Sequence, residues 1–149
     1  LMRTPASEAL PAGAAGLVFF LLVATEANDV AQYVWGKLFG RRKIVPKVSP
    51  NKTWEGFLGG WLTTGLLIWF VGPVFTPLSG IGLAVLAIFL PIAGFAGDVT
   101  MSAIKRDIGV KDTSALIPGH GGLLDRADSL TFTAPLYFHI LAYFALGHF

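Results

Sequence analysis

The sequence predicts an all-α membrane protein with about four transmembrane helices and two basic loops on the cytoplasmic side. Hydrophobic residues make up 54% of its 149 residues, and its mean hydropathy of +0.66 is high for a soluble domain of this length. Its 18 glycines suit close packing between helices in lipid. The apolar stretches lack the polar stripe of elements that face water. A helical core buried within a soluble protein is the alternative interpretation.

Four stretches are apolar enough to form the predicted helices. A helix that crosses a bilayer needs roughly 20 mostly apolar residues. The stretches cover residues 11–35, 54–71, 81–104 and 124–147. The length fits one domain over residues 1–149, and we expect this domain to be the C-terminal part of a longer protein.

Charge is concentrated in two of the connections between these stretches. Residues 36–52 and 102–128 hold all the Lys and Arg residues except Arg3, whereas residues 72–80 carry no charge. With one span between successive loops, both basic loops fall on the same side of the membrane. Cytoplasmic loops carry an excess of Lys and Arg, so we expect this side to be cytoplasmic. The basic residues are Lys37, Arg41, Arg42, Lys43, Lys47 and Lys52 in the first loop, and Lys105, Arg106, Lys111 and Arg126 in the second.

Net charge and cysteine content exclude several classes of function. A net charge of +2 is too small to indicate nucleic-acid binding. Because the chain has no Cys, it has no disulfide, zinc–thiolate site or thiol nucleophile. For Arg41, Arg42 and Lys43 we favour a role in membrane topology and attraction to anionic lipid.

Ionisable and polar groups interrupt the apolar spans toward their cytoplasmic ends. They are Glu26, Asn28, Asp29 and Asp98. Such groups are costly within a membrane and face a cavity or a partner. For Glu26 a hydrogen bond or salt bridge between helices is an equally good interpretation, and the roles of Asn28 and Asp29 stay open.

The stretch SAIKRDIGVKDTSALIPGHGGLLDRAD, residues 102–128, suggests chemistry. Asp98, Ser102 and Lys105 are spaced to share one helix face, as are Asp125 and Asp128. The glycine-rich turn between these groups can bring backbone N–H groups close to an anion. If the loop folds back, the three carboxylates meet at the membrane surface beside basic side chains, an arrangement that suits Mg²⁺ and phosphate. A salt-bridged loop that binds anionic lipid headgroups is the simpler alternative.

These residues resemble the signature of the phosphatidate cytidylyltransferase family, also called CDP-diacylglycerol synthases. A second block, FGRRKIVPKVSPNKTWEG at residues 39–56, resembles the upstream motif of the same family. The resemblance extends from about residue 28 to residue 128. The first block matches at Ser102, Lys105, Arg106, Lys111, Asp112, Ser114, Pro118, His120, Gly121, Gly122, Asp125, Arg126 and Asp128.

The resemblance implies that CTP and phosphatidate in the membrane react to CDP-diacylglycerol and pyrophosphate, with Mg²⁺ as cofactor. Asp98 and Asp125 would be metal ligands, and Asp128 would be a ligand or a neighbour of the ligands. A second cation and a homodimer are left open. Ser49–Pro50 suits the start of a helix, whose N–H groups also favour anions.

The remaining signature residues are implied to bind the substrates. The basic groups would neutralise the triphosphate or the lipid phosphate, and the glycines would offer backbone donors. For His120, phosphate contact and a purely structural role in the turn are equally good interpretations. The implied substrate-binding residues are Lys47, Lys52, Thr53, Ser102, Lys105, Arg106, Lys111, His120, Gly121, Gly122 and Arg126.

Two other functions remain as alternatives. A CTP-dependent lipid kinase acting on a polyprenol or phytol would use an alcohol acceptor and release CDP, whereas a cytidylyltransferase releases pyrophosphate. Glu26 and Asp29 within a span would also suit a non-enzymatic transporter or structural membrane subunit. The sequence lacks a CDP-alcohol phosphotransferase motif and a Walker-type phosphate loop.

Overall fold

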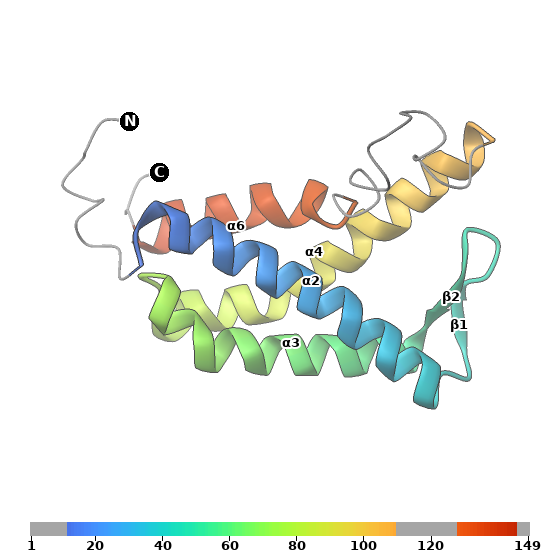
Figure 1. The fold of residues 1–149 in the computed structure, drawn as a ribbon, viewed down its shortest axis with the longest axis horizontal. Coiled ribbons are helices and arrows are strands. Elements are labelled where there is room, and N and C mark those ends of the chain that lie inside the picture. Colours follow the sequence, from blue (N-terminus) through green and yellow to red (C-terminus); the bar gives the residue numbers. More distant parts are fainter. Residues whose placement is uncertain (1–11, 110–127, 146–149) are drawn as a thin grey trace.

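Four helices and a β-hairpin form the fold in the computed structural model, which describes residues 12–109 and 128–145. The helices lie along one another and alternate in direction, and the hairpin lies beyond the end of α2 and the start of α3 (Figure 1). The elements are α2 (Gly13–Phe39), β1 (Lys43–Val45), β2 (Ser49–Thr53), α3 (Trp54–Phe75), α4 (Gly80–Asp107) and α6 (Leu130–Ala145).

Helices α2, α3 and α4 are long and apolar enough to cross a bilayer. This confirms the prediction for three of the four apolar stretches. Helix α2 begins two residues later and ends four residues later than the predicted 11–35, because the apolar run continues to Phe39. The fourth stretch appears as α6, an apolar helix of 16 residues. Residues 124–127 and 146–147 of that prediction lie outside the described residues.

The hairpin corrects two expectations, an all-α fold and a helix start at Ser49–Pro50. Residues Ser49–Thr53 instead form β2, which pairs antiparallel with β1. Pro50 is compatible with this short two-stranded ribbon because an edge strand leaves some N–H groups unpaired. Helix α3 starts after the hairpin, where the hydroxyl of Thr53 accepts a hydrogen bond from the Gly56 N–H at 3.1 Å and caps the helix.

Helices α2 and α3 approach each other closely at glycines where no side chain would fit. A β-carbon at Gly56 would lie 2.7 Å from the carbonyl oxygen of Gln32 and 2.9 Å from the Cα of Gly36. A β-carbon at Gly60 would overlap the side chain of Gln32. Small residues that allow close backbone approach are the main means of helix association in lipid.

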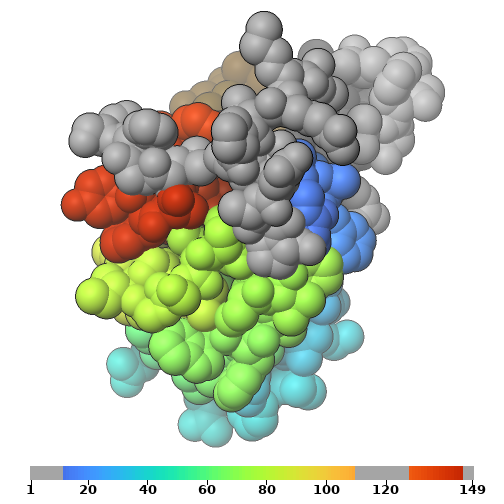
Figure 2. Space-filling view, turned by 90° about the vertical axis from the view of Figure 1, so that its left-hand side faces the viewer, coloured from blue at the N-terminus to red at the C-terminus, as the bar shows by residue number. Residues whose placement is uncertain are grey.

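The interior changes from apolar to polar along the bundle. Away from the hairpin, the core consists of large apolar side chains such as Phe20, Ile68 and Leu86. Figure 2 looks onto this end, where the residues that join α3 to α4 lie at the surface near α6. Toward the hairpin, the Asn28 amide donates to the Pro91 carbonyl at 3.3 Å, and Thr25 donates to Thr133 at 3.2 Å. These bonds tie α2 to α4 and α6 through groups that lipid could not satisfy.

Replacing Gly56 by Ala should destabilise the fold by about 1–3 kcal/mol, because the new methyl group meets backbone atoms of α2 that cannot move aside by rotation. Thermal unfolding in detergent measures the loss. Gly65→Ala on the same helix is the matched control, since its methyl group would meet one carbonyl oxygen, of Ala87, at 3.2 Å. Equal losses in the two variants would contradict the close α2–α3 packing.

Candidate functional site

Two ion pairs join separate elements at the hairpin end of the bundle. The ammonium of Lys52, on β2, pairs with the carboxylate of Asp98, on α4. Lys105 and Arg106 lie in the last turn of α4. The Nζ atom of Lys105 lies 2.5 Å from Oδ2 of Asp128. The Lys105–Asp128 pair is the more enclosed, with side chains 11% and 4% exposed. The charges predicted to gather at this boundary are therefore paired between elements.

The backbone before α6 packs directly on α4 beside Asp98. A β-carbon at Gly97 would lie 2.8 Å from the carbonyl oxygen of Asp128 and 3.2 Å from that of Ser129. The absence of a side chain at Gly97 therefore lets the segment before α6 approach the turn of α4 that carries Asp98. This approach brings the polar groups of α4 and of the residues before α6 into one region.

Helix α2 adds a carboxylate to the same region. The hydroxyl of Ser129 donates a hydrogen bond to Asp29 Oδ2 at 2.7 Å. Asp29 was noted in the sequence as a polar interruption, but no function was assigned to it, and Ser129 was not singled out. The signal for Asp29 was an ionisable residue within an apolar span. We define the carboxylate cluster as Asp29, Asp98 and Asp128, with Lys52, Lys105 and Ser129 as their partners.

The predicted site residues lie in three places. Asp98 and Asp128 belong to the carboxylate cluster, and Lys52 and Lys105 are their partners. Half-buried Ser102 lies on α4 between Asp98 and Lys105. A second set lies outside the described residues: Lys111, His120, Gly121, Gly122, Asp125 and Arg126.

The other predicted residues belong to the hairpin and its surroundings. Lys47 is exposed in the turn between β1 and β2. Thr53 caps α3, so its hydroxyl already has a structural role. Arg106 Nε donates to the Val48 carbonyl at 3.5 Å and thereby connects the end of α4 to the hairpin. These contacts place the predicted substrate-binding residues around the same end of the bundle as the carboxylates.

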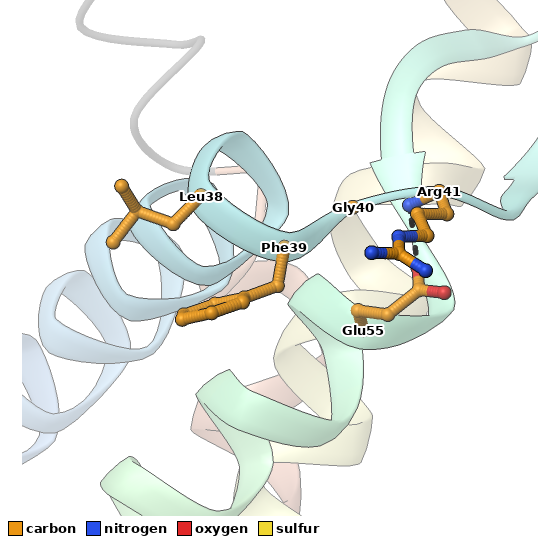
Figure 3. Close-up of a pocket in the computed structure, with 5 residues that line it drawn as sticks. All are labelled: Leu38, Phe39, Gly40, Arg41 and Glu55. Atoms are coloured by element: carbon orange, nitrogen blue, oxygen red, sulfur yellow. Dashed lines mark hydrogen bonds between the residues drawn. The ribbon is translucent and has the colours of Figure 1, made fainter.

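A separate hollow of about 380 Å³ lies beside the end of α2 (Figure 3). The carboxylate of Glu55 accepts from the backbone N–H groups of Arg41 and Arg42 at 3.0 and 3.2 Å, which fixes the chain as it enters the hairpin. Both arginines are exposed, and no member of the carboxylate cluster lines the hollow. A role of these arginines in topology and lipid attraction stays a prediction.

The model of the cytidylyltransferase family matches residues 5–144. The chain belongs to this family. The match confirms the resemblance predicted from the two sequence blocks.

Individual proteins are also similar to the chain. "Uncharacterized protein YnbB" of Escherichia coli K12 is 58% identical over 131 residues, which cover 88% of this chain and 44% of that protein. The phosphatidate cytidylyltransferases of Mycobacterium leprae and Bacillus subtilis are 44% identical over 124 residues and 40% identical over 129 residues. The alignments cover 80% and 86% of this chain but 38% and 48% of those relatives. The chain thus spans less than half the length of these cytidylyltransferases.

The donor atoms in the cluster fit a magnesium ion shared with a substrate. Mg²⁺ prefers oxygen ligands and is usually held by one or two carboxylates, with waters and substrate phosphates completing its shell. Within residues 12–109 and 128–145, no group of three or more acidic or His side chains could hold a metal alone. Asp98 is partly exposed and already faces a cation, the Lys52 ammonium. Its carboxylate has the oxygen atoms that Mg²⁺ accepts as ligands.

Lys105→Met should lower the free energy of unfolding by about 3 kcal/mol, because it removes the ammonium group that pairs with the enclosed Asp128 carboxylate. Lys52→Met is the matched control: Asp98 is 25% exposed, so water can replace part of the lost interaction and the loss should be smaller. Thermal or denaturant unfolding in detergent compares the two. A larger loss for Lys52→Met would show that the Lys105–Asp128 pair does not hold α4 to the segment before α6.

Proposed function

We propose that the protein is a phosphatidate cytidylyltransferase, which converts CTP and phosphatidate to CDP-diacylglycerol and pyrophosphate. The observation that carries this proposal is that the turn of α4 with Asp98 lies against the segment with Asp128, and that each carboxylate pairs with a lysine. Such a site has carboxylates for a divalent cation and ammonium groups for phosphates. It also lies where a lipid headgroup and a water-soluble nucleotide can meet. The names of the relatives support the same reaction.

The orientation in the membrane follows from the charges at this end of the bundle. Residues 1–149 would form one membrane-embedded domain with four spans, α6 being the fourth. The hairpin and the end of α4 would face the cytoplasm because they carry the basic residues. CTP is a cytoplasmic nucleotide, so this orientation would give it direct access to the carboxylate cluster.

The reaction needs little general base catalysis. The nucleophile would be a phosphate oxygen of phosphatidate, and a phosphomonoester with a second pKa near ~6 is largely dianionic at neutral pH. This oxygen forms a bond to the α-phosphorus of CTP, and the bond from that phosphorus to the bridging oxygen breaks to release pyrophosphate. The main barrier is the repulsion between two polyanions, which cationic groups reduce by positioning and charge neutralisation.

The residues of the cluster would divide this task. Asp98 and Asp125 would hold Mg²⁺, with Asp128 beside them, and the ion would stabilise negative charge on the phosphate oxygens. Lys52 and Lys105 would bind phosphate oxygens once substrates arrive, because a lysine can exchange a carboxylate for a phosphate partner.

The remaining basic residues of the signature would act around this centre. Arg106 lies near the hairpin, where it could reach phosphate groups at the membrane surface. Lys111 and Arg126 belong to the connecting loop, as do the backbone donors of Gly121 and Gly122. Together they would surround the triphosphate with positive charge, as the sequence predicts.

Asp98→Asn should lower the rate of CDP-diacylglycerol formation about a hundredfold or more, because an amide is a poor magnesium ligand. Asp125→Asn should have the same effect. The measurement uses radiolabelled CTP and phosphatidate in detergent, with and without Mg²⁺. Asp107→Asn is the matched control, since Asp107 is an exposed carboxylate at the end of the same helix, and its activity should stay unchanged.

The products of this assay also test the alternatives. Pyrophosphate and CDP-diacylglycerol support the proposed transferase, whereas CDP and a phosphorylated alcohol would identify a lipid kinase. Full activity in Asp98→Asn would remove Asp98 from the reaction. No CTP turnover by the full-length wild-type protein would favour a transporter or structural subunit.

A further inference from the structure

The side chain of Gln32 on α2 is buried and makes no hydrogen bond within the part of the chain that the structure describes. The residue is 5% exposed, and neither Oε1 nor Nε2 has a hydrogen-bond partner among the described residues. Because both atoms are unpaired, exchanging the oxygen and nitrogen positions would not change this observation. A buried amide that makes no hydrogen bond costs free energy, so the site favours an occupant with both a donor and an acceptor.

Gln32 lines a small cavity next to the carboxylate cluster. The cavity has a volume of about 60 Å³, enough for about two water molecules or for the edge of a planar ring. Lys52 and Asp29 line it as well, so it adjoins the proposed reaction centre. The lining residues are Asp29, Gln32, Tyr33, Asn51, Lys52, Thr53 and Phe57.

The stem of Gln32 is fixed by helix packing. Gly60 on α3 leaves room for this side chain, since a β-carbon there would overlap the Cγ atom of Gln32. The side chain is therefore held at the α2–α3 interface, where Gln32 lines the cavity. A group fixed in this way can select a ligand by its hydrogen-bonding pattern.

We propose that Gln32 binds the pyrimidine edge of CTP and thereby contributes to selection of cytosine over uracil; this inference rests on the proposed function. Cytosine presents an amino donor at N4 beside the acceptor N3. A carboxamide matches this pair, with Oε1 accepting from the N4 amino group and Nε2 donating to N3, as Asn and Gln do with adenine in DNA. Phosphate groups would instead favour the cationic Lys52 of the same cavity.

The other walls of the cavity suit a base. Phe57 and Tyr33 provide aromatic rings, on which a planar base can stack. Tyr33 is 62% exposed, so the cavity opens beside a side chain that can adjust to a ring larger than the cavity itself. Asp29 Oδ1 has no hydrogen-bond partner among the described residues, and a carboxylate there favours the amino group of cytosine over the O4 carbonyl of uracil.

Gln32→Met in the full-length protein tests the proposal. The dissociation constants of CTP and UTP are measured in detergent for both proteins, together with kcat/KM for CDP-diacylglycerol formation. The wild type should prefer CTP. The variant should bind CTP about tenfold or more weakly while its UTP affinity changes little, so that its preference falls toward one.

Thr64→Val is the matched control. Thr64 is buried on α3, its hydroxyl has no hydrogen-bond partner among the described residues, and it does not line the cavity. Both substitutions remove a buried unpaired polar group, so both should keep or raise the thermal unfolding temperature. Thr64→Val should leave the preference for CTP over UTP unchanged.

The outcomes separate this inference from the proposed function. A stable Gln32→Met protein with an unchanged preference, or with equal losses for CTP and UTP, overturns the inference even if CDP-diacylglycerol is formed. A wild type without preference for CTP overturns it as well. If the wild type binds CTP selectively, Gln32→Met loses this selectivity and no CDP-diacylglycerol forms, the inference stands and the proposed function fails.

Discussion

Pairing between lysines and carboxylates of different elements is the interaction on which the charged end of this protein depends. An isolated ionised group at the end of an apolar helix is costly, whereas a charge with an opposite partner is tolerated. Lys105 and Asp128 meet this condition across α4 and the segment before α6, and Lys52 and Asp98 meet it across the hairpin and α4. The same contacts that lower this cost also bring the acidic groups together.

The arrangement has a chemical consequence under the proposed function, because cationic and anionic groups lie close together at the hairpin end of the bundle. The lysines already have anionic partners and can exchange them for phosphate oxygens. Neutral polar groups lie beside them on α2, where Asn28 ties the helices together and Gln32 lines a cavity. The paired charges and these neutral polar groups thus lie toward the same end of the bundle.

Hydropathy was sufficient to predict the long apolar helices, because their composition alone distinguishes them from surface helices. The spacing of Asp98 and Lys105 correctly placed both on α4 near its polar end. The hairpin was missed because residues 43–53 contain two prolines and none of the Asn-Gly or Asp-Gly pairs that indicate a tight turn. The capping of α3 by Thr53 was likewise not predicted.

The partners of the charged residues could not be predicted from the sequence. Local spacing relates residues within one helix, whereas Ser129 and Asp29 are 100 positions apart, and Lys105 and Asp128 are 23 apart. Such pairs depend on how the helices pack, here on the close approach that Gly97 allows. The sequence also gives no sign that Gln32 is buried or that its carboxamide makes no hydrogen bond among the described residues.

A structure of the full-length protein with CTP and Mn²⁺ in place of Mg²⁺ tests the central claim most directly, because anomalous scattering locates the ion. We expect a peak about 2.0–2.2 Å from an Asp98 carboxylate oxygen and from phosphate oxygens of CTP, with Lys52 moved to a phosphate. A peak remote from Asp98, with the Lys52–Asp98 pair intact and CTP bound elsewhere, would contradict the claim.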